Sequence, residues 1–300
     1  MTSLSAFDSR LTDVAGVSII SSSSVYGGEA GLPLLSVANA QGKALIALQG
    51  AHLVSFVPAG GEDLLWLSPK AVFTEGKAIR GGIPLCLPWF GGHPGGKPAH
   101  GFARVSNWRV DAAEQLADGA IRVVLVLEPN ALSNTLWGDD FRAELAVTVG
   151  SALTLALSFT HRGAAPVTFS QAFHTYFAVG DVRQARIDGL DGTTFINTVG
   201  GANTRHPQAG TLQLGDATDR VYVNVPAEQT ITTASQTIRI VSDTQSAVIW
   251  NPWAESAAKM ADVGDDWAGF VCVERGDVFD NVVELAPAAT YRATMTLSLA

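Results

Sequence analysis

The chain has 300 residues, of which 47% are hydrophobic and 16% are charged, and its formal net charge is −9 with a pI near 5.1. An acidic chain lacks the long-range attraction to phosphate backbones and anionic lipids that binders of nucleic acids and membranes use, so we expect neither partner. The hydrophobic content suffices for a sizeable buried core.

The N-terminal residues do not have the pattern of a targeting segment. Asp8 is an early acid and no apolar core accompanies it, so we expect no secretory signal peptide. No apolar run has the length needed to cross a bilayer. The cysteines, Cys86 and Cys272, do not make a disulfide framework, which favours a reducing cytoplasm as the location. Residues 1–25, which end in a serine run, are expected to be a loosely held lead-in.

Alternation of apolar and polar residues recurs along the chain and predicts β-strands. It is clear in Ile121–Leu127, Leu153–Thr160, Val221–Val225 and Tyr291–Leu299. Such alternation puts one face of a strand into a core and leaves the other face wetter, which is typical of antiparallel sheets. Convincing helices are scarce, and residues 254–262 would give about two turns. We therefore predict an all-β fold with few short helices, a large antiparallel β-sandwich formed as a single domain over residues 1–300.

One stretch, from Lys77 to Arg109, carries clustered cations and no Asp or Glu. Glycines and prolines punctuate it, and aromatic residues lie among its cations. Arginine forks beside exposed backbone suit a small anion such as a phosphate ester. The cationic and imidazole residues of the stretch are Lys77, Arg80, His93, Lys97, His100, Arg104 and Arg109.

Arg80, His100 and Arg104 are the residues of this stretch that we single out. Arg80 precedes two glycines and His100 precedes one, which leaves room for another group to approach. Arg104 follows His100 by four residues, and in an extended chain four steps return to the same face. The simpler interpretation is a structural loop histidine and a surface arginine, but the neighbouring Arg80 favours a binding site. A metal site at His93 and His100 is not favoured, because no third ligand is evident.

His174 lies among aromatic residues in the segment Phe169–Phe177. The usual interpretation of such a residue is a core histidine that is bonded to a carbonyl. Partial burial would also place its pKa where a general acid at neutral pH needs it.

Glu274 stands at the end of an apolar run, where a carboxylate is costly unless it is exposed or paired. Arg275 is an awkward partner, because adjacent strand residues point to opposite faces, so a carboxylate held in a pocket as a base is the sharper interpretation. Cys272 should share the face of Glu274 and pack beneath the pocket. Asp219 opens an alternating strand, where it could cap a turn or accept hydrogen bonds from sugar hydroxyls.

A set of short blocks carries a resemblance that no single block would establish. The blocks are Ile79-Arg-Gly-Gly-Ile-Pro84, Pro88-Trp-Phe-Gly91, His100-Gly-Phe-Ala-Arg104, Phe173-His-Thr-Tyr-Phe177, Asp219-Arg-Val-Tyr222, Trp250-Asn-Pro252 and Phe270-Val-Cys-Val-Glu274. In this order they resemble the D-hexose-6-phosphate mutarotases, the glucose-6-phosphate 1-epimerases of the aldose 1-epimerase superfamily. The resemblance runs from about Gly50 to the C-terminus.

The resemblance implies a galactose mutarotase-like β-super-sandwich without a metal or organic cofactor. It implies interconversion of the α and β anomers of a hexose 6-phosphate, with glucose 6-phosphate as the first choice. It also implies roles for individual residues: His174 as general acid, Glu274 as general base, His100 and Asp219 as substrate-orienting residues, and Arg80 and Arg104 as a phosphate clamp. We further expect a monomer whose partner is a small sugar phosphate.

The chemistry of these residues agrees with the resemblance. Opening a hemiacetal requires removal of the proton on O1 and delivery of a proton to the ring oxygen. We expect the imidazole of His174 and the carboxylate of Glu274 to face each other across a ring-sized cleft, with guanidinium groups at its far end. Two alternatives stay open: an aldose 1-epimerase acting on an unphosphorylated sugar, and a carbohydrate-binding β-sandwich without catalysis.

Overall fold

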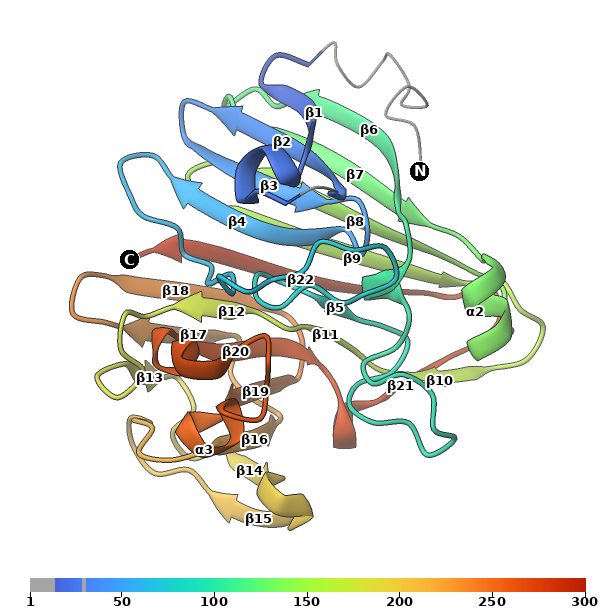
Figure 1. Cartoon of the computed structure of the whole chain (residues 1–300). Helices are drawn as coiled ribbons and strands as arrows, with labels where there is room; N and C mark the ends of the chain where they lie inside the picture. The colour runs from blue at the N-terminus through green and yellow to red at the C-terminus, as the bar shows by residue number, and fades with distance from the viewer. Residues whose placement is uncertain (1–13, 29–30) are drawn as a thin grey trace.

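Figure 1 shows the computed structural model, which describes residues 14–28 and 31–300. In this part of the chain, three large antiparallel sheets pack in a sandwich and a two-stranded sheet accompanies them. The first, which we call the N-terminal sheet, has the strand order β1 (Val17–Ser21), β2 (Pro33–Asn39), β3 (Gly42–Ala47) and β4 (His52–Pro58).

The central sheet has eight strands and carries the longest strands of the molecule. Its order is β13 (Arg186–Asp188), β17 (Glu228–Thr232), β18 (Thr237–Ser242), β22 (Thr290–Leu299), β9 (Leu153–His161), β8 (Phe141–Val149), β7 (Ile121–Leu127) and β6 (Arg109–Gln115).

The third sheet, which we call the site sheet, also has eight strands. Its order is β15 (Thr204–Pro207), β14 (Thr194–Asn197), β16 (Thr218–Val223), β19 (Ser246–Asn251), β20 (Phe270–Asp277), β11 (Gln171–Phe173) and β5 (Leu85–Cys86), and β12 (Tyr176–Ala178) pairs with β20 as well. Separately, β10 (Val167–Phe169) pairs with β21 (Val283–Leu285).

The helices are short and lie in the connections between strands (Figure 1). The α-helices are α1 (Ser23–Tyr26), α2 (Ala131–Leu136) and α3 (Trp253–Ala257), and the 3-10 helices include η3 (Ala103–Val105), η4 (Val199–Gly201), η5 (Gly264–Gly269) and η6 (Phe279–Asn281). Within the described part of the chain, no helix combines the length and the apolar character that a membrane crossing requires.

The core lies on one face of the central sheet. Every second residue of β8 and β9 is buried, as the alternation in their sequences predicts. Their buried side chains share one large apolar cluster with Leu35 and Phe56 of the N-terminal sheet and with Val271 of the site sheet. The central sheet therefore packs against both other sheets, and its second face carries polar side chains.

The structure confirms the predicted all-β fold and corrects two local predictions. Residues Val17–Ser21 are not a loose lead-in, because they form β1 and pair with β2 along their whole length, while residues 1–13 lie outside the described residues. The helix predicted over 254–262 is reduced to α3 (Trp253–Ala257). After α3 the chain continues in turns and in η5 (Gly264–Gly269) before it enters β20 of the site sheet.

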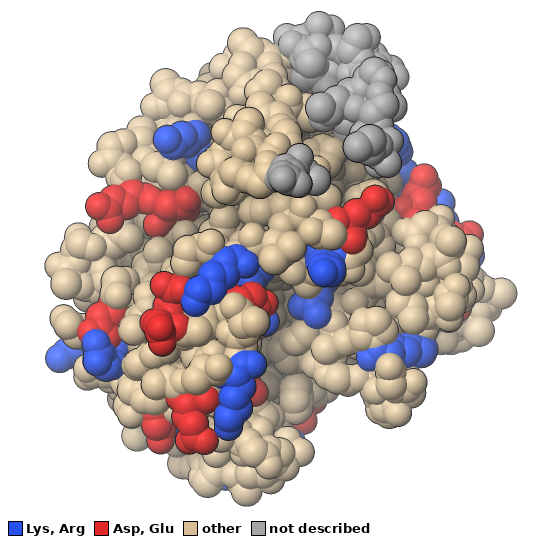
Figure 2. Space-filling model, viewed as in Figure 1, with Lys and Arg blue, Asp and Glu red and all other residues tan. Residues whose placement is uncertain are grey.

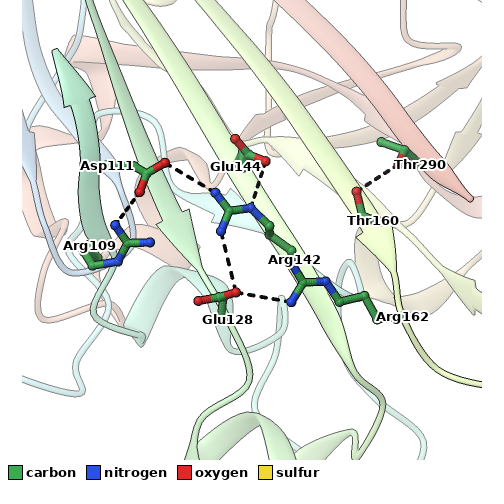
Figure 3. Close-up of polar contacts among 8 residues, drawn as sticks. All are labelled: Arg109, Asp111, Glu128, Arg142, Glu144, Thr160, Arg162 and Thr290. Carbon is green, nitrogen blue, oxygen red and sulfur yellow. Dashed lines mark hydrogen bonds and ion pairs between the residues drawn. The ribbon is translucent and has the colours of Figure 1, made fainter. Parts of the chain in front are cut away.

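A network of ion pairs covers the outer face of the central sheet (Figure 3). Arg142 lies at its centre, with its Nε atom 2.9 Å from Oε2 of Glu144 and its Nη2 atom 3.4 Å from Oδ2 of Asp111. Glu128 lies 3.6 Å from Arg142 and 3.2 Å from Arg162, so it joins two arginines. On the same face the hydroxyl groups of Thr160 and Thr290 are 2.9 Å apart. These contacts link neighbouring strands of the central sheet on this face.

We expect the substitution Arg142→Ala to lower the free energy of unfolding by about 1 kcal/mol, because it removes the shared partner of three carboxylates. The loss should shrink in about 1 M NaCl, where exposed charges are screened. Urea denaturation at low and high salt measures both effects. Arg122→Ala, which breaks an isolated pair with Glu114, is the matched control. Equal losses in the two variants would show that the network adds nothing.

Candidate active site

The register of the site sheet places His174 opposite Glu274. Phe173, the last residue of β11, pairs with Arg275 of β20, so the next residues along the two antiparallel chains face each other. Cross-strand neighbours on one face have Cβ atoms about 5 Å apart. Accordingly, Nδ1 of His174 lies 3.3 Å from Oε1 of Glu274.

This contact corrects the expected spacing of the pair. The structure brings the two side chains together, as the sequence predicts, but the expectation of a ring-sized gap between them is wrong. Neighbouring positions on adjacent strands are too close to admit a sugar ring between their side chains. A ligand has to approach His174 and Glu274 from one side.

Arg275 points to the other face of β20 and does not pair with Glu274. Its Nη1 group donates to Gln229 and, at 3.1 Å, to the carbonyl oxygen of Pro226, and its Nη2 group donates to the carbonyl oxygen of Thr244. Arg275 therefore lies within the sandwich, against the central sheet. Because side chains alternate along β20, Glu274 lies on the outer face of the site sheet.

Burial makes the ionised form of Glu274 unfavourable. The residue is 1% exposed and lies opposite Val248, whose side chain belongs to a small apolar cluster on the outer face. Burial raises the pKa of the Glu274 carboxyl well above its ordinary value, nearby Asp219 raises it further, and Arg104 opposes the rise. The free site therefore favours a protonated carboxyl.

His174 is 8% exposed, and burial lowers the pKa of its imidazole well below the ordinary value, with His100, Arg104 and Arg80 adding to the effect. The expectation that partial burial would leave this pKa near neutrality is wrong for the free protein, because the ring is nearly enclosed and cations surround it. Among the described residues, neither Nδ1 of His174 nor Oε2 of Glu274 has a hydrogen-bond partner. Burial therefore disfavours the charged form of both groups.

His100 lies beside His174, with 5.4 Å between the ring centroids. Its backbone has a positive φ of 64°, and its Nδ1 atom accepts a hydrogen bond from the backbone N–H of Gly91 at 3.3 Å. Burial and two nearby arginines lower its pKa to about 3. His100 is therefore neutral with its proton on Nε2, which makes Nε2 a donor. Its Nδ1 atom also lies 3.2 Å from the thiol of Cys86.

Arg80 is held by two side chains at the edge of the site. Its Nε group donates to Oδ2 of Asp262 at 2.9 Å, and its Nη1 group donates to the hydroxyl oxygen of Tyr176 at 2.9 Å. The Tyr176 ring in turn stacks on His174, with centroids 4.9 Å apart and planes 6° apart. Neither Tyr176 nor Asp262 is predicted from the sequence to have a role at the site. Tyr176 could have been found, because a residue two positions after His174 shares its face.

Arg104 reaches the site from a 3-10 turn. The expectation of an extended segment from His100 to Arg104 is wrong, because Ala103–Val105 form η3 and Gly101 has a φ of 73°. The Nη2 group of Arg104 donates to the carbonyl oxygen of Ala99 at 2.7 Å, while its Nε atom is buried and, in the described part of the chain, has no hydrogen-bond partner. Arg104 and Arg80 both depress the pKa of His174, so both lie within electrostatic range of its ring.

Asp219 lies two strands from Glu274 on the same sheet. It belongs to β16 and pairs with Trp250 of β19, which pairs in turn with Cys272 of β20. Burial raises the pKa of Asp219, with hydrogen bonding to Thr198 opposing the rise. The carboxylate of Asp219 also raises the pKa of Glu274, so the two acids share the outer face of the site sheet.

Figure 2 shows a hollow near the centre of the face seen in Figure 1, and Lys and Arg atoms as well as Asp and Glu atoms lie beside it. Arg80 and Arg104, which both lower the pKa of His174, bring positive charge to the site itself. On a chain whose formal net charge is −9, such a local gathering of cations favours an anionic ligand.

The loop that carries Arg80 depends on a buried histidine. Nε2 of His52 lies 2.7 Å from the carbonyl oxygen of Gly81, and burial lowers the pKa of His52 to about 4. Below pH 6.5 His52 binds a proton in the unfolded chain but not in the folded protein. The free energy of unfolding therefore falls as pH decreases from 6.5 to about 4.

We expect the substitution His52→Gln to weaken this loss of stability at low pH. The lowered pKa of His52 corresponds to a loss of roughly 3 kcal/mol in the free energy of unfolding. This loss is absent above pH 6.5 and complete below about pH 4. Urea denaturation of the wild type and of the variant across this range measures it. His206→Gln alters an exposed histidine and serves as the control. Parallel pH profiles for the wild type and His52→Gln would contradict the expectation.

Sequence comparison finds one family over most of the chain. A family model described as aldose 1-epimerase matches residues 33–298. A protein of Escherichia coli (strain K12), provisionally named a glucose-6-phosphate 1-epimerase, is 38% identical over 249 residues, which cover 81% of this chain and 82% of that protein. A protein of Cenchrus ciliaris with the same provisional name is 33% identical over 265 residues, which cover 84% and 80%.

Solved structures agree with the sequence comparison. A crystal structure from Salmonella typhimurium, provisionally described as a mutarotase, has a TM-score of 0.83 and 33% identity, and the match covers 90% of each chain. A galactose mutarotase related enzyme from Lactobacillus acidophilus has a TM-score of 0.72 at 15% identity, covering 89% of this chain and 97% of that chain. The second similarity concerns the fold alone.

Proposed function

The chain belongs to the aldose 1-epimerase family, and we propose that it is an isomerase that interconverts the α and β anomers of a hexose 6-phosphate, with glucose 6-phosphate as its main substrate. The observation that carries the proposal is the contact of 3.3 Å between His174 and Glu274, with Arg80 and Arg104 close enough to act on the same imidazole.

The contact suits the two oxygens that anomer exchange involves. In a cyclic sugar, the hydroxyl oxygen O1 and the ring oxygen O5 are bonded to the same carbon, C1. A carboxyl and an imidazole that touch each other can therefore serve both oxygens from one edge of the ring. The reaction needs no gap between the two catalytic groups, and their contact supports the proposal.

We assign the general base to Glu274 and the general acid to His174. In the resting site the imidazole is neutral, with its own proton on Nε2, and burial favours one further proton on the carboxyl of Glu274. Transfer of this proton from Glu274 to Nδ1 of His174 gives a carboxylate and an imidazolium without changing the net charge of the site. Glu274 then removes the proton from O1 while His174 delivers one to O5, so that the C1–O5 bond breaks and C1 becomes an aldehyde.

The open-chain intermediate returns the pair to its resting state. After ring opening, Glu274 again carries a proton and His174 is again neutral, which is the form that the buried site favours. Rotation about C1–C2 presents the other face of the carbonyl group, and the same two groups run the steps backwards. Positioned acids and bases of this kind each contribute on the order of 10²–10⁴-fold.

Arg80 and Arg104 are the residues that we propose bind the phosphate group of the substrate. Guanidinium groups bind phosphate oxygens through charge-assisted hydrogen bonds, and the buried Nε atom of Arg104 still lacks an acceptor among the described residues. A phosphate dianion would also offset the two positive charges that depress the pKa of His174. Substrate binding would then raise this pKa and move the shared proton onto the imidazole.

His100 and Asp219 complete the proposal as groups that orient the sugar. A neutral His100 offers Nε2–H as a donor, since Nδ1 already accepts from Gly91. Asp219 offers a partly buried carboxylate on the same face as Glu274. Hydrogen bonds from such fixed groups hold the ring edge against the catalytic pair. We also propose a cytoplasmic location, because both cysteines are free and buried.

Anomer exchange measured on a panel of sugars tests the proposal. Exchange spectroscopy by NMR reports the rate at which each anomer converts, for glucose 6-phosphate and for free glucose and galactose. We expect acceleration of the phosphorylated sugar well beyond that of the free sugars. Equal acceleration of free and phosphorylated sugars would contradict the specificity, and binding without any acceleration would contradict the enzymatic function.

A further inference from the structure

Three groups that commonly bind metals meet at the base of the site. His174, Cys272 and Glu274 each offer one ligand atom, and these atoms all lie within 4.8 Å of one another. The arrangement follows from the sheet, because Cys272 and Glu274 are two residues apart on β20 and His174 lies across from Glu274. All three residues are buried.

Two polar atoms of this cluster lack hydrogen-bond partners among the described residues. These are Nδ1 of His174 and Oε2 of Glu274, both buried, and Cys272 beside them is buried and not in a disulfide bond. Buried polar atoms without partners are rare in folded proteins, and each calls for an explanation such as catalysis or a bound ion. The proposed reaction explains the imidazole and the carboxyl, but it gives no task to the thiol.

The donor set selects the kind of cation. A thiolate, an imidazole and a carboxylate match Zn²⁺, whereas Mg²⁺ and Ca²⁺ require oxygen ligands. Zinc bonds of about 2.0–2.3 Å need ligand atoms about 3.5 Å apart, so small side-chain rotations would close the cluster. The nearby arginines repel every cation, and only bonds to a soft ligand such as the thiolate would offset that repulsion.

We propose that Zn²⁺, or another thiophilic divalent cation, binds to His174, Cys272 and Glu274 and inhibits the enzyme in competition with its sugar substrate. The metal occupies the lone pairs that the proposed mechanism needs on Glu274 and His174, so neither group can then move a proton. The inhibition rests on the proposed function, while the binding of the metal does not. Cys272 is the only one of the three ligands that has no part in the proposed reaction.

Cobalt(II) is the probe for the metal site, because a bound thiolate gives it an intense charge-transfer absorption in the near ultraviolet. Co²⁺ titrated into the chelator-treated full-length protein should produce this band with one metal per chain, and Zn²⁺ should displace it. Cys272→Ala should abolish the band and weaken zinc binding, measured by calorimetry, at least about 10²-fold. Cys86→Ala removes the other buried thiol and should keep the band. Circular dichroism checks that both variants are folded.

Inhibition is measured in the same preparations. Zn²⁺ should slow anomer exchange of glucose 6-phosphate while Mg²⁺ does not, and added substrate should weaken the cobalt band. The zinc concentration for half inhibition should rise at least about 10²-fold in Cys272→Ala, relative to the metal-free rate of that variant.

The outcomes separate the two proposals. A wild type without the cobalt band, a band that persists in Cys272→Ala, or equal inhibition by Mg²⁺ would overturn the metal site. A protein that shows the band but no anomer exchange would overturn the proposed function and leave the metal site standing.

Discussion

Replacing Glu274 by glutamine is expected to lower the rate of anomer exchange by about 10²–10⁴-fold, because the amide cannot take the proton from O1. Glutamine has nearly the shape of the carboxyl, so the contact with His174 and the packing against Val248 are kept. Single-turnover exchange of glucose 6-phosphate, followed by NMR, measures the loss. Near-normal rates would remove Glu274 from the mechanism.

The same substitution should stabilise the protein at neutral pH. The pKa of Glu274 is higher in the folded protein than in the unfolded chain. The free energy of unfolding is therefore highest below the ordinary pKa of a glutamate, and it falls as pH rises from there through the folded pKa. Glutamine does not ionise and escapes the loss. The Tm of Glu274→Gln should therefore exceed that of the wild type above about pH 5, and the gap should widen with pH. Glu284→Gln, at an exposed position of β21, is the control for both activity and stability.

Removing the guanidinium group of Arg80 or of Arg104 should abolish the preference for phosphorylated sugars. Each charge-assisted hydrogen bond to phosphate is worth about 1.5–3 kcal/mol, so Arg80→Ala and Arg104→Ala should each raise KM for glucose 6-phosphate about 10–100-fold. KM for free glucose should change little, because that sugar has no group to meet the arginines. The measured quantity is the ratio of kcat/KM for the two sugars.

A remote arginine controls for the loss of one positive charge. Arg239 of β18 pairs with Glu228 on the central sheet, so Arg239→Ala should leave the ratio unchanged. Ratios that stay the same in Arg80→Ala and Arg104→Ala would contradict the phosphate clamp. In that case the clustering of cations between Lys77 and Arg109 would need another explanation.

Strands could be predicted from the sequence because the order of apolar and polar residues within a strand shows which of its faces is buried. Residues 153–160 and 291–299 alternate and lie in β9 and β22, whereas residues 121–127, which form β7, are an apolar run that is buried on both faces at most positions. The pairing of strands could not be predicted in this way, because it depends on segments far apart in the chain. The contact between His174 and Glu274 is a matter of register, and a distance set by register is invisible to local alternation.

The loop that carries Arg104 shows a second limit of sequence analysis. An extended chain was expected, but His100 and Gly101 both have positive φ values, of 64° and 73°. A side chain at Gly101 would meet the carbonyl oxygen of Leu87 at 2.0 Å, so the chain turns here only because the residue is glycine. The His100-Gly101 dipeptide predicts that another group lies close to the chain here, but it does not show that this group is the backbone of Leu87. Burial, which depends on the whole fold, likewise decided the pKa of His174.

The strand β20 serves two purposes at once, and this has a consequence for how the molecule can move. Its inward side chains belong to the sandwich interior while its outward side chains include Glu274, and β19, β11 and β12 flank it on both sides. A strand that lies this centrally is expected to lose its hydrogen bonds only when the whole domain unfolds. The geometry of the proposed catalytic groups, His174 and Glu274, is thus fixed by the sheet, and it persists for as long as the polypeptide stays native.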